Sequence, residues 1–364
     1  MKIADAVNYL EEFAPASTAE DFDNVGLLVG NPDNPLTGIL ITLDTIEEVV
    51  EEAIQKNCNL IVSFHPIIFS GLKKLTGKDY VERTVIKAIQ NNIAIYAIHT
   101  ALDNHPQGVN KMICDKLGLF KTRILIPKQN IKKLVTYIPT SAADDLRQKL
   151  FEEGAGSIGN YEQCSFNIEG RGSFKPGEGS DPIIGEHGKL HFEKETQIGV
   201  TYPQHLESQI LKSLFTNHPY EEVAYEITFL GNSNQNLGMG MLGELEMKID
   251  EQEFLEKIKT TFKTGCIRHS ALLNKPVKKV AVLGGSGSFA IKDAKKAGAD
   301  FFITADLKYH DFFQAEQKLV VADIGHYESE QYTKNLLHSF LSKKISNFAL
   351  ILASTKTNPI KYYN

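Results

Sequence analysis

A repeated alternation of short apolar runs and amphipathic helices constrains this chain more than any other feature. The apolar run "GILITLD" (38–44) precedes a predicted helix at 45–57, and "LIVSF" (60–64) follows that helix. A second round of the pattern ends in "IAIYAIH" (93–99). Apolar strands that alternate with one-sided helices are typical of a parallel sheet covered on both faces. The sequence therefore predicts an α/β fold for this region.

The alternation changes in the middle of the chain and resumes after it. Four predicted strands and two predicted helices follow one another there in the order strand, helix, strand, strand, helix, strand, which is the order of a ferredoxin-like α+β domain. The polar, glycine-rich stretch 169–189 is expected to form a hairpin excursion between the two middle strands. We therefore predict two similar α/β halves, 1–127 and 233–364, interrupted by an α+β insert at 128–232.

Composition narrows the class of protein. The chain has 364 residues, more than the roughly 250–300 that one core usually supports. No apolar run approaches the ~20 residues of a membrane span, and the start lacks the basic and apolar segments of a secretion signal. The four cysteines form no CxxC pair, which favours reduced thiols over a disulfide framework. We expect a soluble, cytoplasmic protein. A net charge of −6 without a basic stripe argues against a nucleic-acid partner.

Polar side chains stand at the ends of several predicted strands in both halves. In parallel α/β sheets these ends meet at one edge, where ligands bind. Two pairs have a histidine four positions before a carboxylate, a spacing that places both on one face of a helix. The strand-end candidates are His65, His99, Asp103, Asp306, His326 and Glu330.

Imidazoles and carboxylates without thiolates suit divalent zinc, manganese, iron or cobalt. Two such ions bridged by a carboxylate would activate water for attack and stabilise an oxygen-rich leaving group. Hydrolysis is the reaction class that this set favours. His310, four residues beyond Asp306, is a further candidate that could orient a ligand.

The stretch "AVLGGSGSFA" (281–290) leaves two other interpretations open. Gly285, Gly287 and Ala290 fit G-x-G-x-x-A, and Asp306 follows about 20 residues later, as in dinucleotide-binding turns. Alternatively, the amides of 284–288 could hold a substrate phosphate at the start of a helix. No lysine stands in a P-loop register, which excludes a Walker site.

Several motifs together make the chain resemble the GTP cyclohydrolase 1 type 2 homologs, the Nif-three-like dinuclear metal proteins, in their longer bacterial form. They span almost the whole sequence: "DFDNVGLLVG", "FHPIIFSGLKKL", "IHTALDNHPQGVN", "HPYEEVAYEI", "GMGMLGELE", "VAVLGGSGSF", "ITADLKYHD" and "GHYESE".

The resemblance implies that the two α/β halves form one metal-binding unit with up to two divalent ions per chain. It also implies a PII/CutA-like insert and a toroidal homohexamer. It assigns four metal ligands, His65, Asp103, His326 and Glu330, and it leaves His99, Asp306 and His310 as residues that support them. Two positions depart from the family pattern. Phe64 stands where relatives carry a second histidine, and Ala305 stands where glycine is common.

Two functions are compatible with these features. The first is a metal-dependent hydrolase of a nucleotide or another phosphate-bearing small molecule, in which Glu330 moves protons. The second is a regulatory or metal-handling protein that senses a ligand through its insert and has no catalytic activity.

Overall fold

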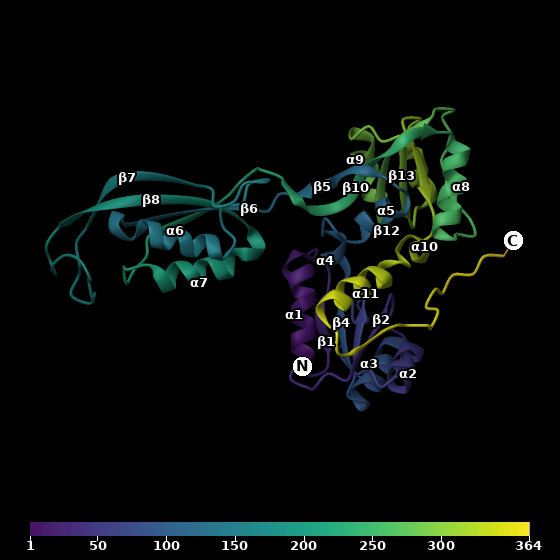
Figure 1. Ribbon diagram of the computed structural model, residues 1–364, viewed down its shortest axis with the longest axis horizontal. Coiled ribbons are helices and arrows are strands. Elements are labelled where there is room, and N and C mark those ends of the chain that lie inside the picture. Colours follow the sequence, from purple (N-terminus) through teal and green to yellow (C-terminus); the bar gives the residue numbers. More distant parts are fainter. Residues whose placement is uncertain (364) are drawn as a thin grey trace. The chain divides into compact units, whose positions relative to one another are not determined.

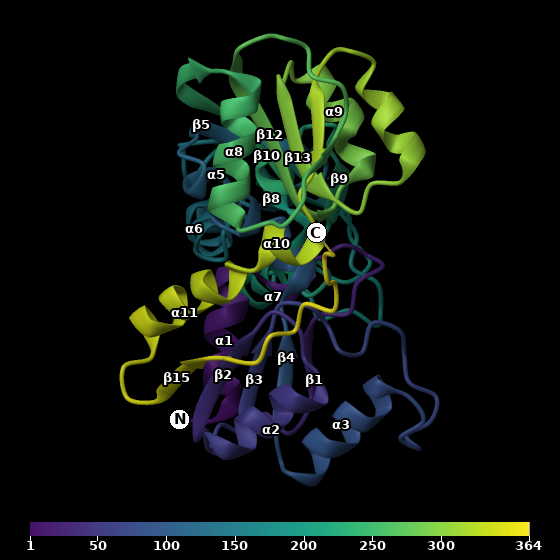
Figure 2. The same cartoon turned by 90° about the vertical axis from the view of Figure 1, so that its right-hand side faces the viewer.

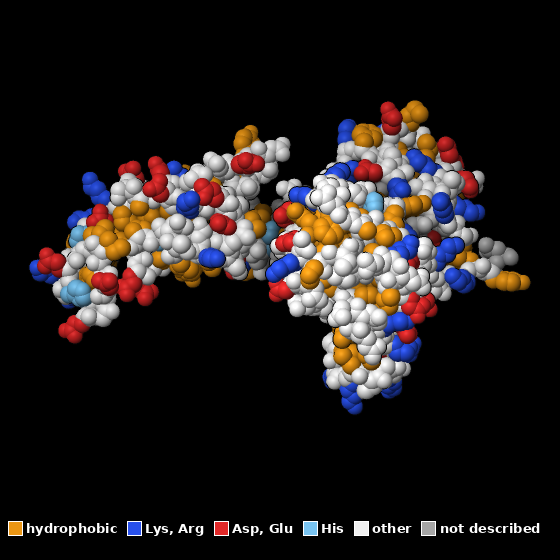
Figure 3. Space-filling view, turned by 60° about the horizontal axis from the view of Figure 1, so that its bottom comes forward, with side chains coloured by type: hydrophobic (Ala, Val, Ile, Leu, Met, Phe, Trp, Pro, Cys, Tyr) orange, Lys and Arg blue, Asp and Glu red, His pale blue; other side chains and the backbone are white. Residues whose placement is uncertain are grey.

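The computed structural model describes residues 1–363, which form two compact units. The first unit joins Met1–Pro127 to the residues from Asn236 onward, and the second is Lys128–Gln235. The predicted insert, 128–232, falls within the second unit. On the face shown in Figure 3, basic and acidic side chains are interspersed and not gathered by sign. Among the described residues, no helix has the length and apolar character needed to cross a membrane.

A five-stranded sheet in the order β1-β4-β3-β2-β15 organises the lower part of the first unit in Figure 2. Its strands are parallel except β1, which pairs with β4 in the antiparallel sense. Helices α2 and α3 pack on one face, and α1 and α11 pack on the other. The elements are α1 (Ile3–Phe13), β1 (Gly26–Val29), β2 (Gly38–Thr42), α2 (Glu47–Gln55), β3 (Leu60–Ser63), α3 (Tyr80–Gln90), β4 (Ala94–Ala97), α11 (Thr333–Lys344) and β15 (Ala349–Leu352).

A six-stranded sheet in the order β11-β14-β13-β12-β10-β5 organises the upper part of the same unit. Helix α9 covers one face, while α5 and α8 pack against the other. The elements are α4 (His99–Asp103), α5 (Val109–Lys116), β5 (Phe120–Lys128), β10 (Asn234–Ile249), α8 (Glu251–Phe262), β11 (Arg268–His269), β12 (Val277–Ser286), α9 (Ile291–Lys296), β13 (Phe301–Ala305), β14 (Val320–Asp323) and α10 (His326–Glu330).

The two α/β halves exchange strands. β5 comes from the N-terminal half of the sequence but lies at the edge of the six-stranded sheet. β15 comes from the C-terminal half but pairs with β2, with Leu350 opposite Ile39. Each half expected from the sequence therefore gives one strand to the sheet of the other, which ties the halves together on both sides of the insert.

The insert contains a four-stranded antiparallel sheet in the order β7-β8-β6-β9. Helices α6 and α7 cover one face of this sheet (Figure 1), where Leu146 and Ile210 pack against Ile198 and Val200. Side chains alternate between the two faces of a strand, so Glu195 and Gln197 lie on the opposite face. The elements are β6 (Ile131–Pro139), α6 (Ala143–Glu152), β7 (Ser165–Phe174), β8 (His191–Pro203), α7 (Glu207–Asn217) and β9 (Tyr225–Phe229).

After β15 the chain returns to the C-terminal half through residues 353–362, which we call the strap. The carboxylate of Glu52 in α2 accepts four hydrogen bonds from Ser354 and Thr355, at 2.6–2.9 Å. Further along the strap, Asn358 donates to Glu328 in α10 at 3.2 Å. The strap is thus bound to both halves.

We expect a Glu52→Gln variant to lose stability at neutral pH but much less in acid. Burial opposes the charge of Glu52, yet the hydrogen bonds from Ser354 and Thr355 outweigh it and lower the pKa from 4.5 to about 2. A depressed carboxylate pKa contributes stability above pH 4.5 that is lost as the pH falls towards 2, here roughly 3 kcal/mol at most. Urea unfolding at pH 7 and pH 3 measures the difference.

The matched control for this experiment is Glu51→Gln, because Glu51 is the exposed neighbour whose contact is a surface ion pair with Lys87. Surface ion pairs contribute about 0–1 kcal/mol. An equal loss of stability in Glu52→Gln at both pH values would contradict this account.

Candidate metal centre

Local structure explains how the strand-end residues reach one place. His65 comes two residues after β3, and His99–Asp103 forms the five-residue helix α4 directly after β4. His326–Glu330 forms the matching short helix α10 after β14. The histidine and the carboxylate of each pair therefore lie on one short helix. Residues four positions apart on a helix lie on the same face, which is the arrangement that joint binding of one ion would need.

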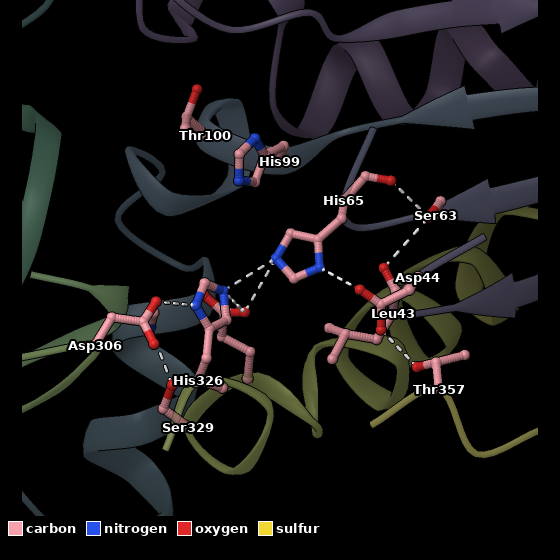
Figure 4. A network of polar contacts seen from close by, with 12 residues as sticks. Leu43, Asp44, Ser63, His65, His99, Thr100, Asp306, His326, Ser329 and Thr357 are labelled. Carbon is pink, nitrogen blue, oxygen red and sulfur yellow. Dashed lines mark hydrogen bonds and ion pairs between the residues drawn. The ribbon is translucent and has the colours of Figure 1, made fainter. Parts of the chain in front are cut away.

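Three of the predicted ligands converge. Nε2 of His65 and Nε2 of His326 are 3.4 Å apart, and Oε2 of Glu330 lies 3.2 Å and 3.1 Å from these two nitrogens. Figure 4 shows the imidazoles of His65 and His326 pointing toward one another from opposite sides. Among the described residues, these three form the group that could hold a metal ion.

Each imidazole of the cluster is oriented by a carboxylate behind it. Nδ1 of His65 lies 2.8 Å from Asp44 Oδ1, and Nδ1 of His326 lies 2.7 Å from Asp306 Oδ2 (Figure 4). A carboxylate at one ring nitrogen fixes the ring and directs the other nitrogen to the metal. Asp306 has φ +57°, a left-handed conformation that is costly for a residue other than glycine.

The same contacts keep the imidazoles protonated in the metal-free protein. Burial lowers the pKa of His65, but Asp44 and Glu330 outweigh it and raise the value to about 9. Burial likewise opposes the charge of His326, while Asp306 and Glu330 raise its pKa to about 11. Only a neutral imidazole nitrogen can bind metal, so ion binding would displace these protons and would weaken as the pH falls.

Two carboxylates contribute to the charge of the cluster: Glu330, which belongs to the group of three, and Asp103, which is half-buried and lies outside that group. Burial opposes the charge of Glu330, but the adjacent His326 and His65 outweigh it and lower its pKa. Burial and then the charge of Glu330 raise the pKa of Asp103 well above its ordinary value. Oδ1 of Asp103 and Oε2 of Glu330 are buried without a partner in hydrogen-bonding geometry. Buried oxygens without such a partner are costly unless something else satisfies them.

The donor atoms fit a divalent ion. Ligands about 2.0–2.1 Å from one ion in a tetrahedral shell lie roughly 3.3 Å from one another. The three observed separations, 3.1–3.4 Å, match this spacing. Two imidazoles and carboxylates without a thiolate suit zinc or a harder transition metal.

The remaining candidates occupy different positions. Nδ1 of His99 lies 2.8 Å from Asp23, and its ring stands edge-on 5.3 Å from that of His65. His310 is exposed, and its ring lies beside those of Tyr309 and Phe313. The structure thus places His99 and Asp306 around the cluster, and it gives His310 no described contact with it.

The glycine-rich end of β12 is shaped around Glu330. Gly285 has φ +67°, and a Cβ there would lie 2.3 Å from Glu330 Oε1. The N–H groups of Gly284 and Gly285 already donate to Asn110 and Ser329, both at 3.0 Å. Two of the backbone amides that could have bound a phosphate therefore already donate hydrogen bonds within the protein. The Asp306 carboxylate contacts the His326 ring instead of a ribose. These contacts favour the metal edge over a dinucleotide site.

Sequence reasoning missed three polar residues around the centre: Asp44, Asp23 and Thr357. Asp44 ends the run "GILITLD", so the rule that found His65 could have found it too. Thr357 donates to Asp44 from the strap, a contact that no local pattern indicates. Asp23 accepts from the Thr100 amide at 3.0 Å besides contacting His99.

We expect Asp44→Asn to weaken metal binding by about 10–100-fold, the usual effect of losing a carboxylate behind a histidine ligand. Without the carboxylate, His65 loses the group that orients its ring. Competition against a chelating indicator dye measures the affinity. Asp33→Asn is the control, since Asp33 is exposed and pairs only with surface Lys2 among its described contacts. Unchanged affinity in Asp44→Asn would rule out this role.

Comparisons with known proteins identify the family of this chain. The family model Duf34/NIF3 (NGG1p interacting factor 3) matches residues 1–359. A Bacillus subtilis protein named GTP cyclohydrolase 1 type 2 homolog is 35% identical over 362 residues, covering 98% of this chain and 97% of that protein. A Halalkalibacterium halodurans protein of the same name is 35% identical over the whole length of both chains.

Solved structures give the same result. The crystal structure of a Bacillus cereus protein related to NIF3 has a TM-score of 0.82 at 35% identity, covering 100% of this chain and 99% of that one. A Staphylococcus aureus crystal structure has a TM-score of 0.78 at 32% identity, with the same coverage. The resemblance expected from the motifs is confirmed. The chain belongs to the Duf34/NIF3 family, whose members include proteins named GTP cyclohydrolase 1 type 2 homolog.

Proposed function

We propose that this protein is a cytoplasmic, divalent-metal-dependent hydrolase acting on a nucleotide or another phosphate-bearing small molecule. The observation that carries the proposal is the convergence of His65 Nε2, His326 Nε2 and Glu330 Oε2 at 3.1–3.4 Å. The relatives' name, GTP cyclohydrolase 1 type 2 homolog, supports a purine nucleotide as the first substrate to test.

The residues of the centre have separable roles in this proposal. His65 and His326 would hold the ion, each oriented by its carboxylate. An ion held there lowers the pKa of water so that a nucleophile forms near neutral pH. Glu330 accepts a proton or shares the ion. Asp103 would add its ionised carboxylate to the ion as a further ligand.

The finer assignments belong to the same proposal. We propose up to two ions of zinc, manganese, iron or cobalt per chain, with Asp103 as the fourth ligand. We also retain the similarity of the two halves, the ferredoxin-like and PII/CutA-like insert, and the toroidal homohexamer. The order of elements in the insert supports its ferredoxin-like fold, and the short helices α4 and α10 at matching strand ends support the similarity of the halves. The homohexamer and the number of ions are proposed from the resemblance to the family alone.

A substrate panel tests the hydrolase function. Protein reconstituted with each metal is assayed against purine nucleotides and simple phosphate esters, alongside Asp103→Asn with its metal content measured. We expect turnover by the wild type that falls by about tenfold or more in the variant, since losing even a residue that only supports a metal ligand costs about 10–100-fold in metal affinity or activity. Turnover that survives Asp103→Asn would contradict the assigned role. Full metal occupancy without turnover on any substrate would favour the metal-handling alternative.

A further inference from the structure

A cavity of about 630 Å³ lies within the insert, and none of its lining residues belongs to the metal centre. Strands β7 and β8 line it on the sheet face that α6 and α7 leave uncovered, and the segments 173–184 and 220–224 also line it. The amide of Asp181 donates to Glu221 at 2.8 Å, which joins these two segments. This volume lies within the roughly 300–1,000 Å³ of small-molecule sites.

The part of the cavity lined by β7 is left open by two glycines. Gly170 and Gly172 face Glu195 and Glu193 across the strand pair. Arg171 alternates with them, and its guanidinium lies over the ring of Phe192, 4.1 Å from the centroid. A Cβ at Gly172 would lie 2.0 Å from Glu195 Oε2. The absence of a side chain there allows the Glu195 carboxylate to lie against the strand.

Glu195 presents a negative charge without a cationic partner among the described residues. Its Oε1 accepts one hydrogen bond, from the Tyr220 hydroxyl at 2.8 Å. Glu193, two residues earlier on the same face, is instead paired with His191 at 3.0 Å. Glu221 and Glu222 add two more carboxylates to the lining. A half-buried carboxylate bonded by a single hydroxyl retains acceptor capacity for a ligand.

Apolar and aromatic side chains form much of the remaining lining, together with Arg171, whose guanidinium lies over Phe192, and Lys175. The rings of Phe174 and Tyr220 lie with their centroids 5.7 Å apart, and Ile168, Pro182 and Ile183 continue this surface. Aromatic faces attract cations as well as apolar groups. We propose that the insert binds a small organic cation in this cavity, an amine or guanidinium on an apolar or aromatic body, with the charged nitrogen on Glu195.

Two probes of opposite charge test the proposal on the full-length protein. Phenethylamine carries the expected ammonium group, and 3-phenylpropionate carries a carboxylate on a body of similar shape. We expect saturable binding of phenethylamine by calorimetry or NMR titration, and at least about tenfold weaker binding of 3-phenylpropionate, because losing a charged hydrogen-bond partner has an effect of this size.

Variants locate the site. Glu195→Gln should weaken phenethylamine binding by about tenfold, whereas Glu193→Gln, the matched control on the same strand and face, should leave it unchanged. Gly172→Ala is a second variant that displaces the Glu195 carboxylate without removing it. The proposal is overturned if folded Glu195→Gln binds phenethylamine as the wild type does, if both probes bind equally, or if neither binds at millimolar concentration.

Discussion

Replacing Glu330 with glutamine should reduce the metal bound per chain by more than about tenfold. Losing a residue that only supports a metal ligand already weakens binding by about 10–100-fold, and Glu330 is itself a predicted ligand. Glu330 is 3% exposed, and its carboxylate lies between the two imidazoles of the cluster. Glutamine preserves the shape but removes the negative charge that an ion requires. Elemental analysis after dialysis against a zinc or manganese buffer measures the loss.

The control for this experiment comes from the same short helix. Glu328 is also buried, at 6% exposure, but it accepts a hydrogen bond from Asn358 of the strap and is not part of the cluster. We expect Glu328→Gln to keep its metal even if it loses stability. Should Glu330→Gln keep a full complement of metal while Glu328→Gln loses it, the centre would have been assigned to the wrong side of α10.

Local sequence patterns located most of the individual elements. The order of strands and helices expected in the middle of the chain is that of β6, α6, β7, β8, α7 and β9. A strand or helix with one covered face shows its hydrophobic period in its own residues. The exchange of β5 and β15 was not expected. The position of an edge strand depends on long-range pairing. The residues of 349–352 do not indicate that the partner strand is β2, more than 300 residues earlier in the sequence.

The same distinction between local and long-range information applies to the centre. His65, His326 and Glu330 were found because each follows the end of a strand in a parallel sheet, although β3 and β14 belong to two different sheets. The orientation of these side chains depends on contacts between residues far apart in the sequence, such as Asp44 with His65 and Thr357 with Asp44. A threonine in the strap has no periodicity that links it to a strand end. Residue identity thus indicated the chemistry, while the fold determined which groups orient it.

The substitution Phe64→His should raise the metal held per chain from about one ion to about two. Phe64 is completely buried, and its ring lies 4.9 Å from that of His65 and edge-on 5.5 Å from that of His99. The resemblance to the family places a second histidine at this position. An imidazole there would add a donor beside His99, where the wild type presents only an aromatic ring.

This gain should come with a loss of stability in the metal-free protein. Placing a polar imidazole in a packed apolar site costs about 1–3 kcal/mol, and binding of the second ion should recover it by mass action. Elemental analysis and thermal unfolding with and without metal measure both effects. Phe64→Leu is the matched control, because it changes the packing without adding a ligand and should keep the wild-type metal content. A folded Phe64→His protein that holds no more metal than Phe64→Leu would show that Phe64 is not what limits this centre to one ion.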